Sequence, residues 1–343
     1  MRLRRVLFSI SLALSIGWTS GQTRVAQGAA SSHADAGTTS NRAPIDVFVG
    51  SYLVRIPSLS FRDNQWTVDA YVWFRWSGDL SPPPQESFAL CNATIEKKEV
   101  TDSKKVRLKR SNIEQEFEYA CVRIQATVTS FWDISRYPFD EHALRLIIED
   151  NREFARVRYR VDHDACVLDG MCKMPGWDLG APRVQSIAHT YPTNYGDPEF
   201  SADRESSFAS LHIDIPLTRA NRLLYSFKVF NGLYLSVAIA LLAFFVKPQR
   251  VDVRFGTGVG AVFAAIASQY VITSSLPDTG QLTLVDELYG IGTGIIFLSV
   301  LESAAALYLS ETGHHRAARF LDHVSFVILS AGYFIANFWL VRP

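Results

Sequence analysis

Side chains that could perform catalysis or bind a metal ion are few in this chain, and they are scattered along it. Asp162-His163-Asp164 offers hard oxygen ligands of the kind that a divalent cation prefers. A solvated turn explains the same run, and we favour that interpretation. The sequence contains no GxSxG, HExxH, P-loop or GxGxxG motif. We therefore expect neither an enzyme nor a bound cofactor or metal.

The cysteines are a second set of reactive side chains, and all of them precede the long apolar runs of the chain. They are Cys91, Cys121, Cys166 and Cys172. In an oxidising compartment such thiols pair, and the short separation of Cys166 and Cys172 favours a small-loop disulfide, which would leave Cys91 for Cys121. Three connectivities remain open on the sequence alone. No CxxC spacing supports a metal site instead.

Charge is distributed unevenly along the chain. Lys+Arg and Asp+Glu each total 34, so no basic excess suggests a nucleic-acid partner. Charged residues crowd the region before Arg222, and long apolar runs follow it. Basic residues and then a short apolar run open the chain, which predicts a signal peptide over residues 1–28, with a first transmembrane helix as the alternative. Residues 29–43 have the composition of a disordered tether.

Residues 44–220 have the pattern of a β-sandwich. Short runs rich in β-branched and aromatic residues, such as 66–76, 143–149 and 208–217, are separated by turn formers. No long helical pattern lies between them, as expected for packed antiparallel sheets. We predict an extracytoplasmic β-sandwich, with strand runs also expected near 47–54, 121–129 and 177–191.

Four apolar runs fill residues 221–343, and each is long enough to cross a hydrocarbon core of about 30 Å. They extend over about 223–246, 255–276, 288–309 and 320–341. Buried helices of a soluble domain are the alternative. The predicted fold class is therefore an α+β multidomain membrane protein, with the sandwich followed by a four-helix transmembrane bundle. Glu302 interrupts the third run, where a buried carboxylate requires a partner or water.

The connections between these runs indicate their orientation. Lys247 and Arg250 lie between the first and second runs, and Arg316 and Arg319 lie between the third and fourth. The connection at 277–287 contains no Lys or Arg. The positive-inside rule places the two basic connections in the cytoplasm, so the sandwich is expected on the periplasmic or extracellular side of the plasma (inner) membrane.

Several motifs, in order, resemble the pentameric ligand-gated ion channels, the Cys-loop receptor superfamily. The segment Trp132-Asp133-Ile134-Ser135-Arg136-Tyr137-Pro138-Phe139-Asp140 resembles the Pro-Phe-Asp loop of that family, and Trp76 its core tryptophan. Arg222-Leu223-Leu224-Tyr225 resembles the start of its first span, and residues 254–277 its second span. Ser130 and Leu144 stand where the family has its eponymous cysteines, which resembles the bacterial branch.

The resemblance implies a homo-oligomer, a pentamer in that family, with its pore lined by the second span. Residues spaced alternately three and four apart share one face of a helix. The pore-lining residues predicted in this way are Asp252, Gly256, Gly260, Phe263, Ala267, Tyr270 and Ser274. Phe263 would form a hydrophobic constriction, and Asp252 a carboxylate ring that favours cations. Close helix packing at the glycines is the alternative.

The resemblance also implies a ligand site between subunits and a contact that couples it to the membrane domain. The predicted ligand-binding residues are Tyr71, Phe154, Tyr159, Tyr191, Tyr195 and Phe200. Their rings would suit an amine cation, although nearby Arg204 and Glu205 leave an acidic or zwitterionic ligand open. Ordinary packing is the alternative for each ring. Asp140 and Arg222 are predicted to couple the two domains, with a purely structural ion pair as the alternative.

Two functions remain in contention at this stage. One is a ligand-gated ion channel subunit in the lipid bilayer, which passes an inorganic ion when a small molecule or a proton binds outside. The other is a non-conducting, membrane-anchored ligand-binding or sensor protein of the same fold, which the few polar residues of the second span favour. The sequence names neither the ligand nor the ion.

Overall fold

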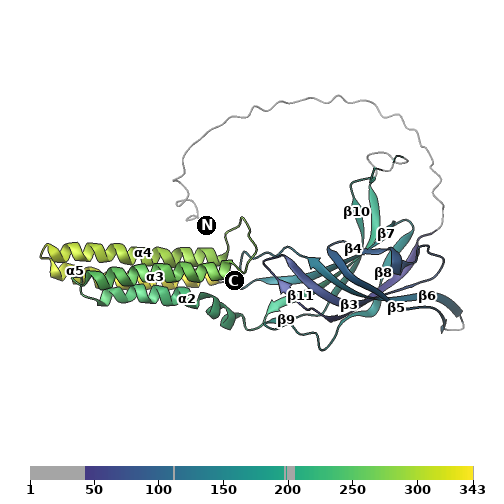
Figure 1. Cartoon of the computed structure of the whole chain (residues 1–343), viewed down its shortest axis with the longest axis horizontal. Helices are drawn as coiled ribbons and strands as arrows, with labels where there is room; N and C mark the ends of the chain where they lie inside the picture. The colour runs from purple at the N-terminus through teal and green to yellow at the C-terminus, as the bar shows by residue number, and fades with distance from the viewer. Residues whose placement is uncertain (1–42, 111–112, 197, 199–204, 343) are drawn as a thin grey trace, which may run out of the picture. The chain divides into compact units, whose positions relative to one another are not determined.

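The computed structural model describes residues 43–110, 113–196, 198 and 205–342, and the side chains of 108–115 and 163–165 are not described. The predicted signal peptide, nearly all of the predicted tether, and Phe200 and Arg204 lie outside the described residues. The described part begins with β strands and ends with long helices (Figure 1).

The larger sheet has the strand order β5-β6-β3-β1-β8. Its members are β1 (Ile45–Arg55), β3 (Gln65–Trp76), β5 (Ala93–Arg110), β6 (Ile113–Thr129) and β8 (Val157–Leu168), and short β2 (Leu59–Ser60) pairs with β3. The pair β1–β8 is parallel, and the other pairs are antiparallel.

The smaller sheet has the strand order β10-β11-β7-β4, and β9 pairs with β11. Its members are β4 (Phe88–Leu90), β7 (Glu141–Glu153), β9 (Trp177–Leu179), β10 (Arg183–Tyr191) and β11 (Ser206–Arg219). The single-turn helix α1 (Pro84–Ser87) precedes β4. All pairs of this sheet are antiparallel, as expected for a sandwich in which each sheet buries one face.

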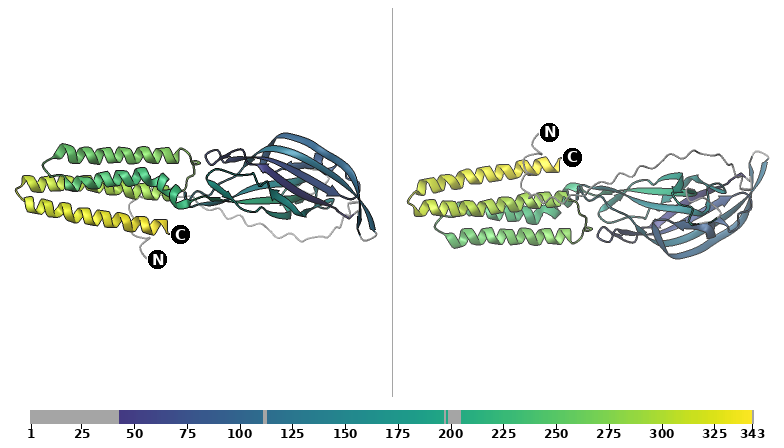
Figure 2. Two further views of the ribbon diagram at one scale, coloured as in Figure 1. Left: turned by 90° about the horizontal axis from the view of Figure 1, so that it is seen from below. Right: turned by 90° about the horizontal axis from the view of Figure 1, so that it is seen from above.

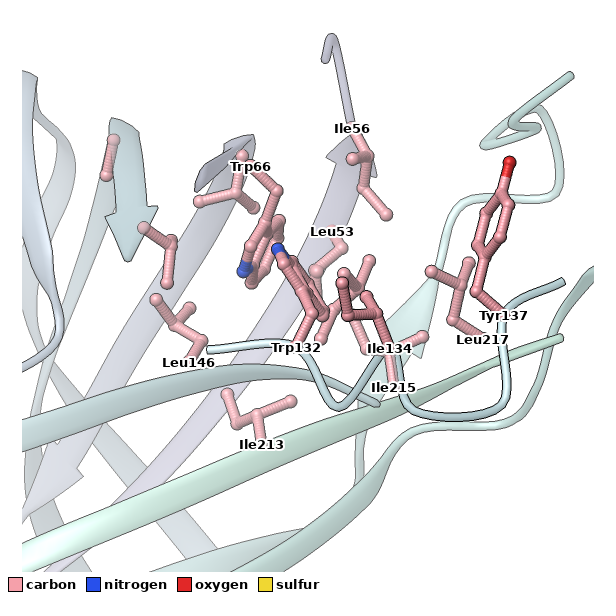
Figure 3. Close-up of a cluster of buried hydrophobic side chains, with 14 of the residues drawn as sticks. Leu53, Ile56, Trp66, Trp132, Ile134, Tyr137, Leu146, Ile213, Ile215 and Leu217 are labelled. Carbon is pink, nitrogen blue, oxygen red and sulfur yellow. The ribbon is translucent and has the colours of Figure 1, made fainter. Parts of the chain in front are cut away.

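The core between the sheets is built from alternate residues of the strands. In β3 and β11 nearly every second side chain is buried, as the period of two in a pleated strand requires. The β6–β7 connection adds Trp132 and Ile134 to the same cluster (Figure 3). Trp66 donates a hydrogen bond from Nε1 to Ser130 Oγ over 3.1 Å, which ties that connection to β3.

The second part of the chain consists of α2 (Arg222–Leu242), α3 (Val251–Thr273), α4 (Leu284–Glu311) and α5 (His315–Val341), packed as a bundle (Figure 2). A 3-10 turn, η1 (Ala243–Phe245), continues α2. All four helices are long and apolar enough to cross a membrane. The predicted fold class, a β-sandwich followed by a four-helix bundle, is therefore confirmed.

The second apolar run differs from its helix at both ends. We expected 255–276, whereas α3 starts at Val251 and ends at Thr273. Asp252 in the first turn favours the earlier start, because a carboxylate interacts well with the positive end of a helix. Pro277 disfavours helical geometry in the residue before it, so the chain turns at 274–276.

The strand β5 was missed by the sequence analysis, because its many charges obscured the alternation. It forms one edge of the larger sheet, where charged side chains discourage further strand pairing. Opposite charges face each other across the β5–β6 pair, with Lys105 3.2 Å from Glu118 and Arg107 3.5 Å from Glu116. Cross-strand partners therefore allow a polar sequence to form a long strand.

The expected disulfides are not formed, since all four cysteines of the chain are free in the structure. Cys121 lies on β6 of the larger sheet, opposite Trp73. Cys91 follows β4 of the smaller sheet, and its sulfur lies 4.0 Å from the hydroxyl oxygen of Tyr191. Cys166 lies on β8 beside Ser51, and Cys172 is in the turn that follows. Each thiol thus has neighbours other than the expected cysteine.

The buried indole of Trp66 is expected to be a main support of the sandwich. Replacing Trp66, which is 0% exposed, by alanine removes core packing and should destabilise the domain by about 3–5 kcal/mol. Phe131→Ala is the matched control, because this nearby ring is 89% exposed, and it should change stability by less than about 0.5 kcal/mol. Thermal unfolding of the full chain followed by circular dichroism measures both; equal shifts would contradict the assigned core.

Candidate functional site

One face of α3 is left uncovered by its own chain. The seven residues predicted to line a pore are all exposed: Asp252, Gly256, Gly260, Phe263, Ala267, Tyr270 and Ser274. Ser274 is the residue that caps the helix rather than part of it. The opposite face contains Arg254, Gly258, Ala261 and Ala265, which are buried. The predicted face is therefore unpartnered in a single chain.

The glycines of α3 have different surroundings. A Cβ atom at Gly258 would overlap the side chain of Val300 on α4, so this glycine permits a close approach of the two helices. At Gly256 and Gly260 a Cβ atom would meet nothing within 4 Å. The packing alternative therefore applies to Gly258, whereas Gly256 and Gly260 lie on the open face.

Arg254 holds the buried face of α3 against its neighbours. Its side chain is 1% exposed and donates hydrogen bonds to the carbonyl oxygen of Val246 and, over 2.8 Å, to Asp322 of α5. Glu302 of α4 lies 4.0 Å from the same guanidinium, so the ionisable group expected to need a partner is next to one. A buried cation between two carboxylates restricts how these three helices can slide past each other.

A second buried cation, Arg219, lies where β11 leads into α2. Its Nε donates to Asp140 over 3.2 Å, and Asp140 also shares a hydrogen bond with His142. Aromatic rings surround the guanidinium, with centroids 4.1 Å away at Trp177 and 4.4 Å away at Tyr225. The arrangement combines a charge-assisted hydrogen bond with cation–π contacts.

The coupling pair expected from the sequence was Asp140 with Arg222, and the structure corrects it. Arg222 donates instead to the exposed Glu141 over 2.5 Å, while Asp140 binds Arg219. Asn221 has a left-handed backbone conformation with φ of 52° between the strand and the helix. This turn directs Arg219 toward the interior and Arg222 toward the surface.

The Asp140 carboxylate is kept in its charged form by its neighbours. Burial by itself would raise its pKa, but the hydrogen bond from His142 and the charge of Arg219 outweigh burial and lower the pKa below its usual value. The ion pair therefore persists at neutral pH.

The β6–β7 connection that holds Asp140 also contacts the first turns of two helices. The carbonyl oxygen of Ser135 accepts a hydrogen bond of 2.8 Å from the backbone N–H of Leu284, the first residue of α4. The hydroxyl groups of Tyr137 and Tyr225 lie 2.8 Å apart, which links the connection to α2. A displacement of this connection would therefore disturb its hydrogen bonds to both helices.

Near the β10–β11 connection a carboxylate lies beneath a group of rings. Glu149 of β7 is 8% exposed, accepts a hydrogen bond of 2.9 Å from the Tyr191 hydroxyl and lies 2.9 Å from Nδ1 of His189. The rings of Tyr195 and Phe208 pack edge-on against Tyr191, with centroids about 6 Å away. Burial and the bond to Glu149 raise the pKa of Tyr191, so its hydroxyl donates as a neutral group. Tyr195 remains 62% exposed, so among the described residues one side of the cluster is left open.

The other predicted ligand residues within the described part of the chain, Tyr71, Phe154 and Tyr159, do not join this cluster. Tyr159 is 2% exposed, donates to Asp150 and packs on Phe74, so it is a core residue, and its predicted ligand role is corrected. The Phe154 ring lies under the guanidinium of Arg158 at 5.3 Å. Tyr71 lies on β3 of the larger sheet, with Arg123 over its ring at 5.5 Å. Of the predicted ligand residues that the structure describes, it therefore brings together Tyr191 and Tyr195.

Glu149 and His189 were missed by the sequence analysis, as was the role of Arg219. Glu149 and Asp150 are adjacent buried carboxylates near the end of an apolar strand, and such charges break the alternation in a way that could have been noticed. Asp162 gives no support to a metal site, because it binds Arg75 over 2.8 Å and Trp73 Nε1 over 3.1 Å. Among the residues that the structure describes, no group of three metal-ligating side chains occurs.

Comparison with known proteins finds similarity to receptor subunits. No family model matches the chain. Gamma-aminobutyric acid receptor subunit rho-3 of Homo sapiens is 23% identical to it over 291 residues, which cover 78% of this chain and 59% of that subunit. Gamma-aminobutyric acid receptor subunit rho-1 of Mus musculus is 22% identical over 304 residues, with coverages of 82% and 60%.

The chain spans about three fifths of the length of the curated relatives it matches. With four helices able to cross a bilayer, it is a multi-pass membrane protein. Membership of the bacterial branch stays a prediction. The chain is similar to these receptor subunits over about four fifths of its length, and its β-sandwich followed by four apolar helices agrees with the predicted resemblance to the Cys-loop receptor superfamily.

Proposed function

We propose that this chain is a subunit of a ligand-gated ion channel, that several copies form a ring, and that α3 of each copy lines the pore. The observation that carries the proposal is the uncovered face of α3. Only 17% of the most apolar stretch of α3 is buried within the chain, against 44% of the corresponding stretch of α2. A helix of this kind needs a second copy, lipid or water against its open face.

The composition of that face favours water over lipid. The exposed residues of α3 on the predicted pore line combine glycine, alanine and serine with Phe263 and Tyr270, and Val259, Ile266 and Val271 are exposed beside them. Helix α5 is still more open, with 6% of its apolar stretch buried. It exposes large apolar side chains, as a helix in contact with lipid does: Phe320, Val327, Ile328, Phe334, Ile335, Phe338 and Trp339. In the ring that we propose, Phe263 forms the narrow apolar constriction, and Asp252 supplies carboxylates at the mouth between α2 and α3.

The ligand that we propose is a small molecule with an ammonium group. Glu149 supplies a buried negative charge, and the surrounding rings supply faces for cation–π contacts. Because the cluster is open on one side, a neighbouring copy would complete it, and Tyr71 with Arg123 lies on the other sheet as a candidate for that second wall. The names of the relatives, receptor subunits for gamma-aminobutyric acid, agree with this class of ligand.

The link between ligand and pore, in this proposal, is the β6–β7 connection held by Arg219. It contacts the first turn of α2, which directly follows β11, and the first residue of α4, which follows the α3–α4 connection. Ligand binding would shift a balance between two packings of this connection. Sidedness follows the positive-inside rule, with the sandwich outside the cell membrane.

The proposed pore is tested by Phe263→Ala in the purified, ring-forming protein in a planar bilayer. Removing the apolar constriction should raise the unitary current or the open probability several-fold, since dewetting no longer closes the pore. Phe334→Ala is the matched control on α5, because that ring is 74% exposed and Phe263 is 70% exposed. The control should leave the current unchanged.

Silence of wild type and Phe263→Ala alike, from protein shown to form rings, would contradict the pore. It would favour the second candidate, a non-conducting ligand-binding sensor of this fold. Equal effects of the α3 and α5 variants would contradict the assignment of α3.

The coupling role is tested by Arg219→Ala against Arg222→Ala. Arg219→Ala leaves Asp140 buried without its cation and should abolish gating while ligand binding persists. Arg222→Ala removes a half-exposed pair with Glu141 and should change gating little. Ligand binding and current are measured on the same preparations; the reverse ranking of the two variants would overturn this assignment.

The same site predicts that gating is lost at acidic pH, where Asp140 becomes protonated. Because the pKa of Asp140 is lowered, the stabilisation from its charged form is present above the ordinary carboxylate pKa of about 4 and is lost as pH falls through the lowered value. Asp140→Asn has no carboxylate to protonate, so it should gate poorly at every pH and show no further loss of current between neutral and acidic pH.

The ligand proposal is tested with Glu149→Gln, which keeps the shape and removes the charge. The affinity for gamma-aminobutyric acid and simple alkylamines should fall about tenfold or more, as expected when a hydrogen-bonded charge is lost. Glu116→Gln, an exposed carboxylate on β6 paired with Arg107, is the matched control and should have no effect. Isothermal titration of the assembled ring is the measurement; unchanged affinity in Glu149→Gln would rule out this carboxylate as the ammonium partner.

A further inference from the structure

A cavity of about 540 Å³ lies at the end of the bundle where α2 leads to α3 and α4 leads to α5. It is far along the chain from the sandwich residues of the ligand cluster. Its walls come from the segment after α2, from the last turn of α4 and from the first turns of α5. A space of this size could hold a phosphate-bearing head group together with the first carbons of a chain.

The charges around this cavity are mostly positive. Its basic or titratable lining residues are Lys247, His315, Arg319 and His323. Asp322 is its one acidic lining residue among those described, and this carboxylate is 3% exposed and already accepts a hydrogen bond from Arg254. No salt bridge of Lys247 or Arg319 occurs within the described part of the chain, and both side chains are exposed. Two cations are thus available to an anion from outside.

The start of α5 adds to the preference for an anion. His314, the residue before the first helical turn, makes no side-chain cap hydrogen bond to that turn. The N-terminal end of a helix carries a partial positive charge and unpaired N–H groups. Gln249 donates to Ser310 over 2.6 Å, and Ser310 lies 3.0 Å from Nδ1 of His315, so polar groups hold one wall in place.

The remaining wall is aromatic and continues onto the outside of the bundle. Phe326 packs edge-on against Phe245, with centroids 5.0 Å apart, and against Phe244, with centroids 6.4 Å apart. Phe245 is mostly exposed, so an acyl chain leaving the cavity would meet an apolar surface. A free phosphate ion would make no use of this wall.

We propose that this cavity binds the phosphate head group of an anionic phospholipid. Lys247 and Arg319 contact the phosphate, and the three phenylalanines contact the beginning of its acyl chains. Basic pockets between transmembrane helices at the cytoplasmic surface suit such lipids, and the basic connections place this end of the bundle at that surface. The lipid would join the α2–α3 connection to α5, next to the Asp322–Arg254 pair that fixes the start of α3.

The test measures binding of pyrene-labelled phosphatidylglycerol to the full chain in detergent, with phosphatidylcholine as the zwitterionic reference. Lys247→Ala/Arg319→Ala should weaken phosphatidylglycerol binding about 25-fold, from about fivefold for each basic side chain. Arg250→Ala/Arg316→Ala is the matched control, because it removes the same charge from the same end of the bundle outside the cavity. The control should weaken binding by roughly twofold or less.

Phe326→Ala is the second variant, and it keeps every charge. It should weaken binding of the lipid and leave binding of glycerol 3-phosphate unchanged. Size-exclusion chromatography establishes that each variant assembles as the wild type does. Equal losses in the two double variants, or no loss in either, would overturn the proposal by reducing it to general surface charge. Glycerol 3-phosphate binding as tightly as the lipid would overturn the lipid assignment in favour of a soluble phosphate.

Discussion

The ion pair between Arg219 and Asp140 is the contact on which the junction of this protein depends. A guanidinium at the end of a buried strand is removed from most of its water, and that cost is recovered only if a carboxylate and electron-rich rings replace the water. Asp140, Trp177 and Tyr225 supply these partners from the β6–β7 connection, from β9 and from α2. One buried cation therefore fixes three segments of different origin at the same point.

A second buried cation has a comparable role at the other end of the bundle. Arg254 lies between carboxylates of α4 and α5 and binds a backbone carbonyl of the segment after α2. The apolar contacts between these helices are non-directional, and they would allow a helix to rotate or slide. The charged contacts do not, because an unpaired buried charge costs far more than a small shift of packing. The open face of α3 is thus fixed in direction by the charges on its other face.

The parts of the protein that stabilise one chain differ from the parts that we propose to be active. The sandwich core and the buried face of α3 are completed within one chain, whereas the Glu149 cluster and the exposed face of α3 are each open on one side. Open, chemically distinctive faces of this kind are where assembly and ligand binding are expected. The proposed lipid cavity differs from both, because its walls belong to a single chain and its proposed occupant is an anion rather than another subunit.

The order of strands and membrane helices could be predicted from the sequence, because period-two alternation and long apolar runs are local properties of the chain. The spacing of the predicted face of α3 was also local, and every one of its members is exposed in the structure. Even here β5 was missed, since its strand character depends on the charges of β6 opposite it.

Partners of individual side chains were decided only by the tertiary structure. Arg219 and Arg222 are three residues apart and chemically identical, yet the left-handed turn at Asn221 places one beside Asp140 and the other beside Glu141. Tyr159 and Tyr191 are both strand tyrosines, and the packing of the two sheets buries the first and leaves the second at the edge of an open cluster. The cysteines likewise lie beside residues other than the cysteines with which they were predicted to pair. Such outcomes depend on which way a side chain points once strands pair and sheets pack, and no local pattern of residue types contains that direction.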